Sequence, residues 1–226
     1  MIQPKPRGSF FNQLIKIVTS SLCRIKKNNL DEIPHEGPLI VFTNHIGGLE
    51  IPLIYSHLQP RPITAMAKIE SWDNGIVSWL FDLWKIIPVR RGEADVDAIR
   101  QSIEMIREGY IFAITPEGTR SRDGKLRHAH PGVVPLALHS GAPLLPMAHW
   151  GAENFPENIK KLRRTDFEIR LGNAFILDAR GERATSAVRE EMVSEMMYQL
   201  AKLLPPKYRG YYADVENATE KYLRFL

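Results

Sequence analysis

Residues 43–50 of the chain read Thr43-Asn44-His45-Ile46-Gly47-Gly48-Leu49-Glu50. The apolar run at 38–42 before them is typical of a buried β-strand, so His45 is expected in the loop where that strand ends. Positions five apart lie about 140° apart around a helix, so Glu50 can reach the imidazole of His45 only if the backbone bends, which the two glycines permit. The stretch therefore predicts a histidine base oriented by a carboxylate. The other interpretation is a helix-capping Asn44 beside an incidental surface histidine.

A second apolar run, at 111–114, leads into the turn Thr115-Pro116-Glu117-Gly118-Thr119-Arg120-Ser121-Arg122. An arginine guanidinium presents a planar fork of donors suited to phosphate, and glycine lets backbone N–H groups approach an anion. A solvated basic loop is the plainer interpretation. Because one chain contains two such strand-end loops, one with a base and one with an anion site, we favour a functional site.

These two stretches resemble motifs of the PlsC-type glycerolipid acyltransferase family, which is typified by lysophosphatidic acid acyltransferases. The first motif of that family is NHxxxxD, the second ends in an arginine, the third is FPEGTRS, and the fourth is a small apolar segment around a proline. The matching segments in this chain are 44–50, 86–90, 115–121 and 144–147. Their order and spacing agree over roughly residues 30 to 180, which is most of the chain.

The resemblance implies a role for each matching residue. His45 would be the general base and Glu50 the acid that orients it. Arg120 would be the main phosphate ligand, and Lys68, Arg91 and Arg127 are weaker candidates. The whole set expected to bind substrate is Asn44, Arg90, Glu117, Gly118, Thr119, Arg120 and Arg122.

The chain departs from the family pattern at two positions. Glu50 stands where the family usually has Asp, and its additional methylene requires a slightly different backbone for the same hydrogen bond. His130 stands in the segment where members often have Lys-x-Gly, which replaces a permanent charge by one that titrates near neutrality. Lys125 or Arg127 could supply the missing charge. The second departure bears on the identity of the acceptor.

The chemistry implied by the resemblance is acyl transfer from a thioester to an alcohol, which needs a base at the attacking hydroxyl and no acyl-enzyme. We expect an O-acyltransferase that converts a lysophospholipid, 1-acyl-sn-glycerol 3-phosphate, to phosphatidic acid. The donor would be acyl-coenzyme A or acyl-acyl carrier protein, without a cofactor, and the spacing of the histidines indicates no metal site. Alternatives are another acceptor (a different lysophospholipid, glycerol phosphate or a glycolipid), a thioester hydrolase, and a non-catalytic lipid-binding protein at the membrane surface.

The composition is that of one ordinary globular domain, with 226 residues, 44% hydrophobic and 25% charged. The single Cys23 excludes an intramolecular disulfide. A formal net charge of +4 suits an anionic substrate or lipid surface, and the absence of a nucleic-acid-binding signature argues against nucleic acid as a partner. Because no apolar run approaches the roughly 20 residues of a membrane span, we expect a peripheral protein at the cytoplasmic face of the membrane.

The chain is expected to divide into an N-terminal amphipathic helix within 1–30 and an acyltransferase domain at 31–226. The helix opens at Ser9 and has cations at its polar edge, namely Arg24, Lys26 and Lys27. Either this helix packs on the domain or it lies in a membrane interface. The tryptophan-rich segment 71–84 has the same two interpretations, a core helix or a contact with acyl chains and headgroups.

Alternating strands and helices predict an α/β fold with a mostly parallel central sheet flanked by helices. The expected strands are 38–42, 63–67, 86–89, 111–114, 143–148 and 167–175. The expected helices are 51–58, 94–108 with an inward stripe of Val96, Ile99, Ile103 and Ile106, 133–140, 184–204 and a short one in the tail. Both motif loops would then lie at the carboxyl ends of strands, where open α/β sheets bind ligands.

Overall fold

The computed structural model describes residues 9–58, 60–90 and 95–226. Within these ranges the strands form one nine-stranded sheet, and the pairs at its centre are parallel. Its main path runs β1 (Cys23–Asn28), β7 (Thr165–Leu171), β6 (Leu144–Trp150), β2 (Leu39–Thr43), β5 (Ile111–Ile114), β3 (Ile63–Lys68) and β4 (Ile87–Val89). β8 (Phe175–Leu177) pairs antiparallel with β6 and with β9 (Leu223–Phe225), and β7 is also antiparallel to β6. The predicted α/β fold is confirmed.

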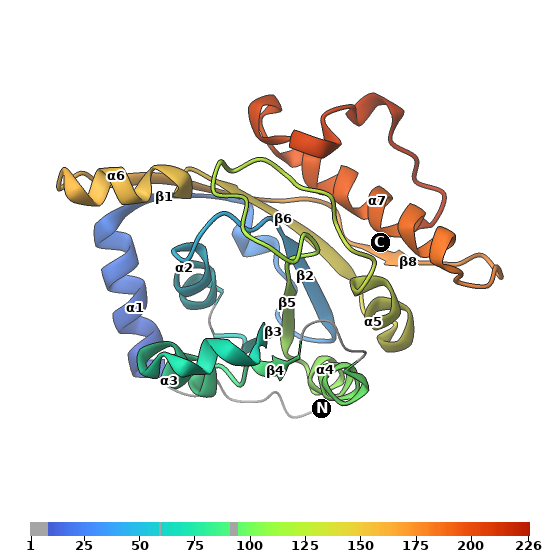
Figure 1. The fold of residues 1–226 in the computed structure, drawn as a ribbon, viewed down its shortest axis with the longest axis horizontal. Coiled ribbons are helices and arrows are strands. Elements are labelled where there is room, and N and C mark those ends of the chain that lie inside the picture. Colours follow the sequence, from blue (N-terminus) through green and yellow to red (C-terminus); the bar gives the residue numbers. More distant parts are fainter. Residues whose placement is uncertain (1–8, 59, 91–94) are drawn as a thin grey trace.

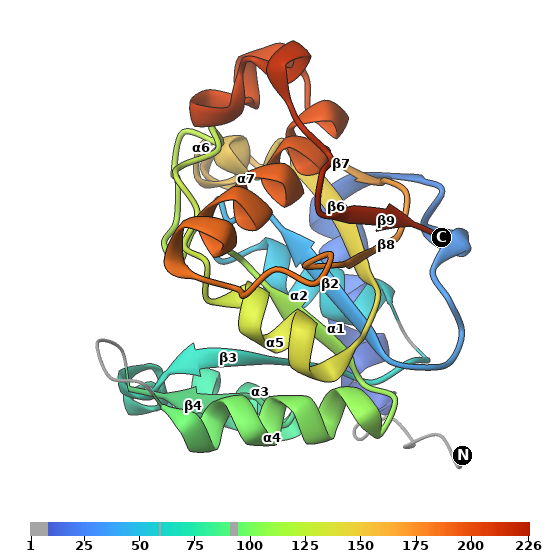
Figure 2. The same cartoon turned by 90° about the vertical axis from the view of Figure 1, so that its right-hand side faces the viewer.

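Helices cover both faces of this sheet (Figures 1 and 2). One layer consists of α1 (Ser9–Leu22), α2 (Glu50–His57) and α3 (Gly75–Leu83). The other consists of α4 (Val96–Arg107), α5 (Val133–Ser140) and α7 (Ser186–Leu203). The short α6 (Phe155–Lys160) connects β6 to β7 and projects from one side of the molecule (Figure 1).

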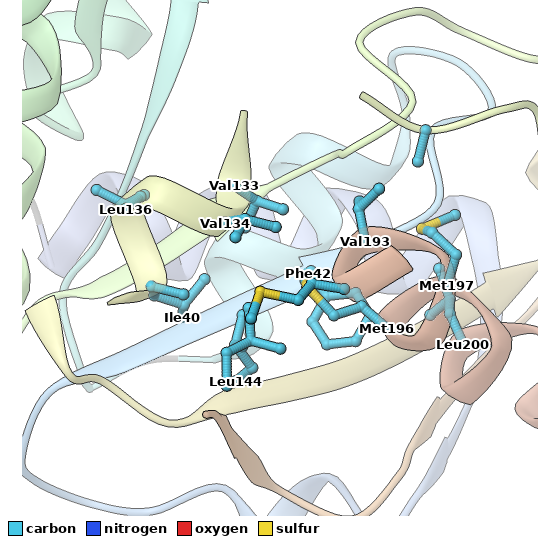
Figure 3. Close-up of a cluster of buried hydrophobic side chains, with 14 of the residues drawn as sticks. Ile40, Phe42, Val133, Val134, Leu136, Leu144, Val193, Met196, Met197 and Leu200 are labelled. Carbon is cyan, nitrogen blue, oxygen red and sulfur yellow. The ribbon is translucent and has the colours of Figure 1, made fainter. Parts of the chain in front are cut away.

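The central strand β2 is buried over its whole length, and its alternate side chains enter two different hydrophobic cores. Ile40 and Phe42 face α5 and α7, where they meet Val134 and Met196 (Figure 3). The neighbours of these two residues in the strand belong to the core beneath α1, α2 and α3. Because a strand covered on both faces needs apolar side chains at every position, the continuous run in the sequence identified it correctly.

The parallel pairing brings the two motif loops to the same edge of the sheet. β2 and β5 are direct neighbours, and Phe42 pairs with Ile114 near the end of each strand. β6 lies on the other side of β2, also parallel to it. The loops that follow these three strands therefore leave from one edge, as expected for a site at the carboxyl ends of strands.

The structure differs from the sequence prediction at both ends of the chain. α1 ends at Leu22, and the basic residues expected at its edge, Arg24 and Lys26, lie on β1, which pairs with β7. In the tail, the expected short helix is three short 3-10 helices, and the strand β9 follows them. In both segments, hydrogen bonds to a strand distant in sequence override the local pattern.

Two interior elements also differ. The expected strand 167–175 is two strands, β7 and β8, separated by an irregular segment at 172–174, and both run antiparallel to β6. On α4, Val96 is 70% exposed, and the buried residues are Ala98, Ser102, Met105 and Ile106. Of the predicted stripe, Ile106 is buried and Ile103 packs against the core, whereas Val96 faces solvent.

The tryptophan-rich segment forms a helix at the surface of the molecule, and its partly buried Leu80, Phe81 and Leu83 pack against the core. No residue of α3 is buried, and Trp79 is 44% exposed. Trp84, directly after the helix, is buried and donates its indole N–H to Asn12 on α1. Among the described helices, none is both long enough and apolar enough to cross a membrane.

Candidate active site

His45 and Glu50 meet because the chain bends sharply between β2 and α2. Glu50 begins α2, and its carboxylate turns back toward the preceding loop. Its Oε1 lies 2.6 Å from Nδ1 of His45 and also accepts hydrogen bonds from the backbone N–H groups of Ile46 and Gly47. The bend that the two glycines were expected to permit therefore exists, and the longer glutamate side chain spans it.

The ionisation of Glu50 determines which nitrogen of His45 is free. Burial alone would raise the pKa of Glu50, but the hydrogen bond from His45, nearby histidines and backbone N–H donors outweigh it and hold that pKa below 4.5. An ionised carboxylate only accepts, so Nδ1 of His45 carries the proton and donates. The unprotonated Nε2 is then free to take a proton, and the His45 side chain is 18% exposed, so a substrate can reach it.

Glu117 holds the backbone of the base instead of lying open to substrate, which differs from its expected role. Its Oε1 accepts from the N–H of His45 at 3.0 Å, and its Oε2 accepts from the N–H of Arg127 at 2.8 Å. The side chain is 1% exposed. Burial, only partly offset by these two donors, raises the pKa of Glu117 to about 7. The N–H of Ser121 also donates to the His45 carbonyl, so the third-motif turn is hydrogen-bonded to both the N–H and the carbonyl of His45.

Asn44 likewise differs from the expected substrate ligand. Its side-chain amide donates to the carbonyl of His149 and accepts from the N–H of His149, at 2.8 and 3.0 Å. In return, Nε2 of His149 lies 2.8 Å from the Asn44 carbonyl. Asn44 therefore joins the ends of β2 and β6 and fixes the loop in which His45 lies.

His149 is a residue of this site that the sequence did not single out. It is fully buried, and its ring stacks on Phe167 with centroids 5.4 Å apart. Because Nε2 must donate to a carbonyl, Nδ1 is left as a lone-pair acceptor without a partner. Burial lowers the pKa of His149. The available signal in the sequence was the position of His149 near the end of the strand that carries the fourth motif. Its spacing did not distinguish it from the other histidines.

The remaining expected substrate ligands are placed around the edge of the sheet. Thr119, Arg120 and Arg122 are exposed after β5. Gly118 has a φ of +65°, and a Cβ there would lie 3.3 Å from the ring of His130. Arg90 is exposed at the end of β4, which β3 separates from β5, and Arg91 lies outside the described residues.

The arrangement combines a proton acceptor with exposed cations. The backbone of His45 is hydrogen-bonded to the turn that presents Arg120 and Arg122. Such a site can take a proton from a hydroxyl while it holds an anionic group of the same molecule. Among the described residues, no three His, Cys, Asp or Glu side chains converge as a metal site.

Comparison with known proteins agrees with this geometry. A model of a family described as Acyltransferase matches residues 24–150. The 1-acyl-sn-glycerol-3-phosphate acyltransferase of Bacillus subtilis is 28% identical over 153 residues, covering 67% of this chain and 75% of that protein. A Borreliella burgdorferi protein of the same name is 30% identical, over 55% of this chain and 50% of its own length. The lyso-ornithine lipid O-acyltransferase of Pseudomonas aeruginosa is also 30% identical, over 52% of this chain and 44% of that protein.

A solved structure supports the same assignment. The crystal structure of PlsC, the 1-acyl-sn-glycerophosphate acyltransferase of Thermotoga maritima, superposes with a TM-score of 0.65 at 25% identity. The match covers 86% of this chain and 77% of that one. Since the family model spans more than half of the chain and the fold agrees, the protein belongs to the acyltransferase family.

Proposed function

We propose that this protein transfers a fatty acyl group from an acyl thioester to the free hydroxyl of 1-acyl-sn-glycerol 3-phosphate, yielding phosphatidic acid in phospholipid synthesis. The observation that carries the proposal is the pair of His45 and Glu50 fixed beside a turn rich in exposed arginine. The names of the relatives from Bacillus subtilis and Thermotoga maritima support the same acceptor.

The proposed reaction proceeds by direct attack of the acceptor. Nε2 of His45 takes the proton of the acceptor hydroxyl as its oxygen bonds to the thioester carbonyl carbon. The carbon–sulfur bond then breaks, and the leaving thiolate receives that proton from His45. Glu50 keeps the imidazole in the correct tautomer and stabilises its protonated form. No cofactor is needed for this step.

The exposed arginines would bind the phosphate of the acceptor. Arg120 is the main candidate, because it follows the turn that Glu117 fixes to the backbone of His45. Arg122 and Arg90 would contribute from the same edge of the sheet. The thioester would be carried by coenzyme A or by acyl carrier protein.

A membrane surface is the proposed source of the lipid acceptor, with the protein bound at its cytoplasmic face. The exposed apolar side chains of α1 and α3 form the contact, and the rings of Phe11 and Trp79 join the two helices at a centroid distance of 4.9 Å. Large apolar side chains that are 42–76% exposed favour an apolar environment over water. They are Phe10, Phe11, Leu14, Ile17, Val18, Ile76 and Trp79.

The test is the release of free thiol from palmitoyl-coenzyme A by the purified protein, with and without 1-acylglycerol 3-phosphate. Release that requires the acceptor, and that falls by roughly 10²–10⁴-fold in His45→Ala, supports the transferase and its base. Release indifferent to the acceptor would instead identify a hydrolase. Lyso-ornithine lipid and further lysophospholipids serve as competing acceptors, since His130 stands in the segment where members of the family often have Lys-x-Gly. Silence with all acceptors and with acyl carrier protein would favour a non-catalytic lipid-binding protein.

A further inference from the structure

In the segment between α6 and β7, Leu162 combines a left-handed backbone with an exposed apolar side chain, and each is unfavourable for folding. α6 ends in a Schellman turn, in which the N–H of Leu162 donates to the Ile159 carbonyl and the N–H of Arg163 donates to the Asn158 carbonyl. This turn places Leu162 in the left-handed region, with a φ of +52°, where glycine is normally preferred. The Leu162 side chain is also 96% exposed.

The other non-glycine residues with positive φ make Leu162 unusual. Among the described residues they are Asn29, Lys85 and Arg180, all of them polar. A polar residue at a strained and exposed turn has the compensation of solvation, and an asparagine adopts this conformation readily. A leucine has neither advantage, so the position is poorly explained by the stability of the isolated protein. A backbone outlier of this kind is a reason to look for a function.

The residues around Leu162 are strongly basic. Lys160, Lys161, Arg163 and Arg164 are all exposed. One of these cations, Lys161, pairs with Glu157 at 3.6 Å. We call residues 159–164, with their two exposed apolar side chains and four cations, the α6 tip.

The α6 tip is attached to the helix already proposed to meet the membrane. The guanidinium of Arg164 donates to the carbonyls of Ser20 and Cys23, at 2.7 and 2.6 Å, and so fixes the tip to the C-terminal end of α1. Ile17 and Val18 lie in the second half of the same helix, 56% and 48% exposed. Figure 1 shows α1 and the far end of α6 at the same side of the molecule.

We propose that the α6 tip is a lipid contact in which Leu162 enters the interface of an anionic bilayer while the flanking cations bind lipid phosphates. An apolar side chain surrounded by cations is complementary to an interface with negative headgroups above acyl chains. The acidic surface of a carrier protein would satisfy the cations, but it gives no reason for a leucine directed outward at a strained turn. The inference goes beyond the proposed acyl transfer, because it adds a second contact, distant in sequence from α1, that sets how the protein lies on the membrane.

The first test uses the conformation of Leu162. Leu162→Gly removes the apolar side chain and relieves the left-handed backbone, so the free energy of unfolding should stay unchanged or rise. Its partition coefficient onto vesicles of phosphatidylcholine and phosphatidylglycerol, measured by co-sedimentation, should fall roughly tenfold. Arg180→Gly, a glycine substitution at another left-handed position, is the matched control and should bind these vesicles like the wild type.

The second test separates charge from apolar insertion. The triple variant with Gln at positions 160, 161 and 163 should lose roughly tenfold or more in binding to the mixed vesicles, and little to vesicles of phosphatidylcholine alone. High salt should abolish this difference. The control replaces three exposed arginines elsewhere, Arg100, Arg107 and Arg183, by Gln and should bind more tightly than the tip variant.

The outcomes that overturn the proposal are distinct from a failure of the proposed activity. His45→Ala is inactive under the proposed mechanism and yet should bind vesicles like the wild type. If Leu162→Gly binds vesicles like the wild type, or loses stability together with binding, the tip has no direct lipid contact. If the tip variants bind vesicles normally but lose turnover with acyl carrier protein and not with coenzyme A, the tip instead belongs to the carrier protein.

Discussion

At the scale of single residues, Glu50 shows how one methylene changes the geometry of a motif. Its carboxylate reaches the His45 imidazole and the backbone N–H groups of Ile46 and Gly47 from the first position of α2. An aspartate at this position is shorter by one bond, although most of the family has an aspartate in this motif. The glutamate therefore depends on the particular loop of this chain.

We predict that Glu50→Asp lowers kcat roughly tenfold although it restores the family residue, because the shortened carboxylate loses its reach to His45. Glu50→Gln should lower kcat by roughly 10³-fold or more, since an amide can hold the imidazole in the wrong tautomer. Acceptor-dependent thiol release measures both rates. Equal activity of Glu50→Asp and wild type would contradict the geometric argument.

Glu117 leads to a prediction about pH and stability. Its pKa rises from 4.5 to about 7 on folding because the carboxyl is buried. Between those pH values the folded protein binds more protons than the unfolded chain, so this residue lowers the free energy of unfolding as the pH rises from about 4.5 to about 7.

The side chain of Glu117→Gln cannot titrate. As the pH rises from about 4.5 to about 7, the free energy of unfolding of this variant relative to the wild type should therefore increase by roughly 1–3 kcal/mol. Urea unfolding of both proteins at several pH values measures the difference. A difference that does not change with pH would contradict the raised pKa. Activity should fall in the variant at every pH, because an amide cannot accept from both His45 and Arg127.

At the scale of elements, the C-terminal segment supports the loop that follows the third motif. The N–H of Leu126 donates to the Tyr208 carbonyl, and the N–H of Tyr211 donates to the Leu126 carbonyl. The hydroxyl of Tyr212 accepts from the N–H of Ala129. The loop that presents Arg127 and His130 is thus held by Glu117 on one side and by the tail on the other. The family model, which ends at residue 150, does not include that tail.

Gly210 is the most sensitive point of this contact. It has a φ of +50°, and a Cβ there would lie 2.2 Å from the Leu126 carbonyl oxygen. We predict that Gly210→Ala displaces the loop and raises the KM for the lysophospholipid roughly tenfold, with a smaller change in the KM for the thioester.

Two tyrosine variants provide a milder test and its control. Tyr212→Phe leaves the N–H of Ala129 unpaired and should raise the KM for the acceptor in the same direction. Tyr222 is as buried a residue as Tyr212, but its hydroxyl bonds to Lys221 and Glu182 and not to the loop, so Tyr222→Phe should leave KM unchanged. Similar effects of the two variants would indicate a general loss of stability instead of loop positioning.

At the scale of the whole molecule, Cys23 reports on the attachment of α1 to the sheet. It is the single cysteine, is 1% exposed, and begins β1 directly after the helix. Burial raises the pKa of its thiol. Both features keep the thiolate, which is the reactive form, rare and inaccessible.

We therefore predict that the native protein reacts with an aromatic disulfide reagent at least roughly a hundredfold more slowly than the urea-unfolded chain. The reaction is followed by absorbance, and Cys23→Ala provides the blank. Fast reaction of the native protein would mean that α1 and β1 detach readily from the sheet. Slow reaction also keeps Cys23 from interfering when the same reagent detects thiol release from coenzyme A.

The sequence predicted much of the site because its chemistry is local. His45 and Glu50 lie within one bend of the chain, and the glycines between them indicated that the bend was possible. The continuous apolar runs of β2 and β5 likewise identified strands buried on both faces, since each position needs an apolar side chain. The alternation of strands and helices predicted a mostly parallel sheet with both motif loops at the carboxyl ends of strands, but the order of the strands came only from the structure.

Only the tertiary structure determined which motif residues are exposed and which hold the loops. Glu117 and Asn44 look like ligands in the sequence, but each bonds to the backbone of a distant residue. Glu117 accepts from His45, 72 positions away, and Asn44 donates to His149, 105 positions away. The same holds for β1, which reads as the end of a helix until it pairs with β7 across 142 residues. The local sequence pattern predicts a helix or strand correctly when the side chains of that element alone determine whether it is buried. A distant hydrogen-bond partner has no trace in that pattern, so its effect is decided when the chain folds.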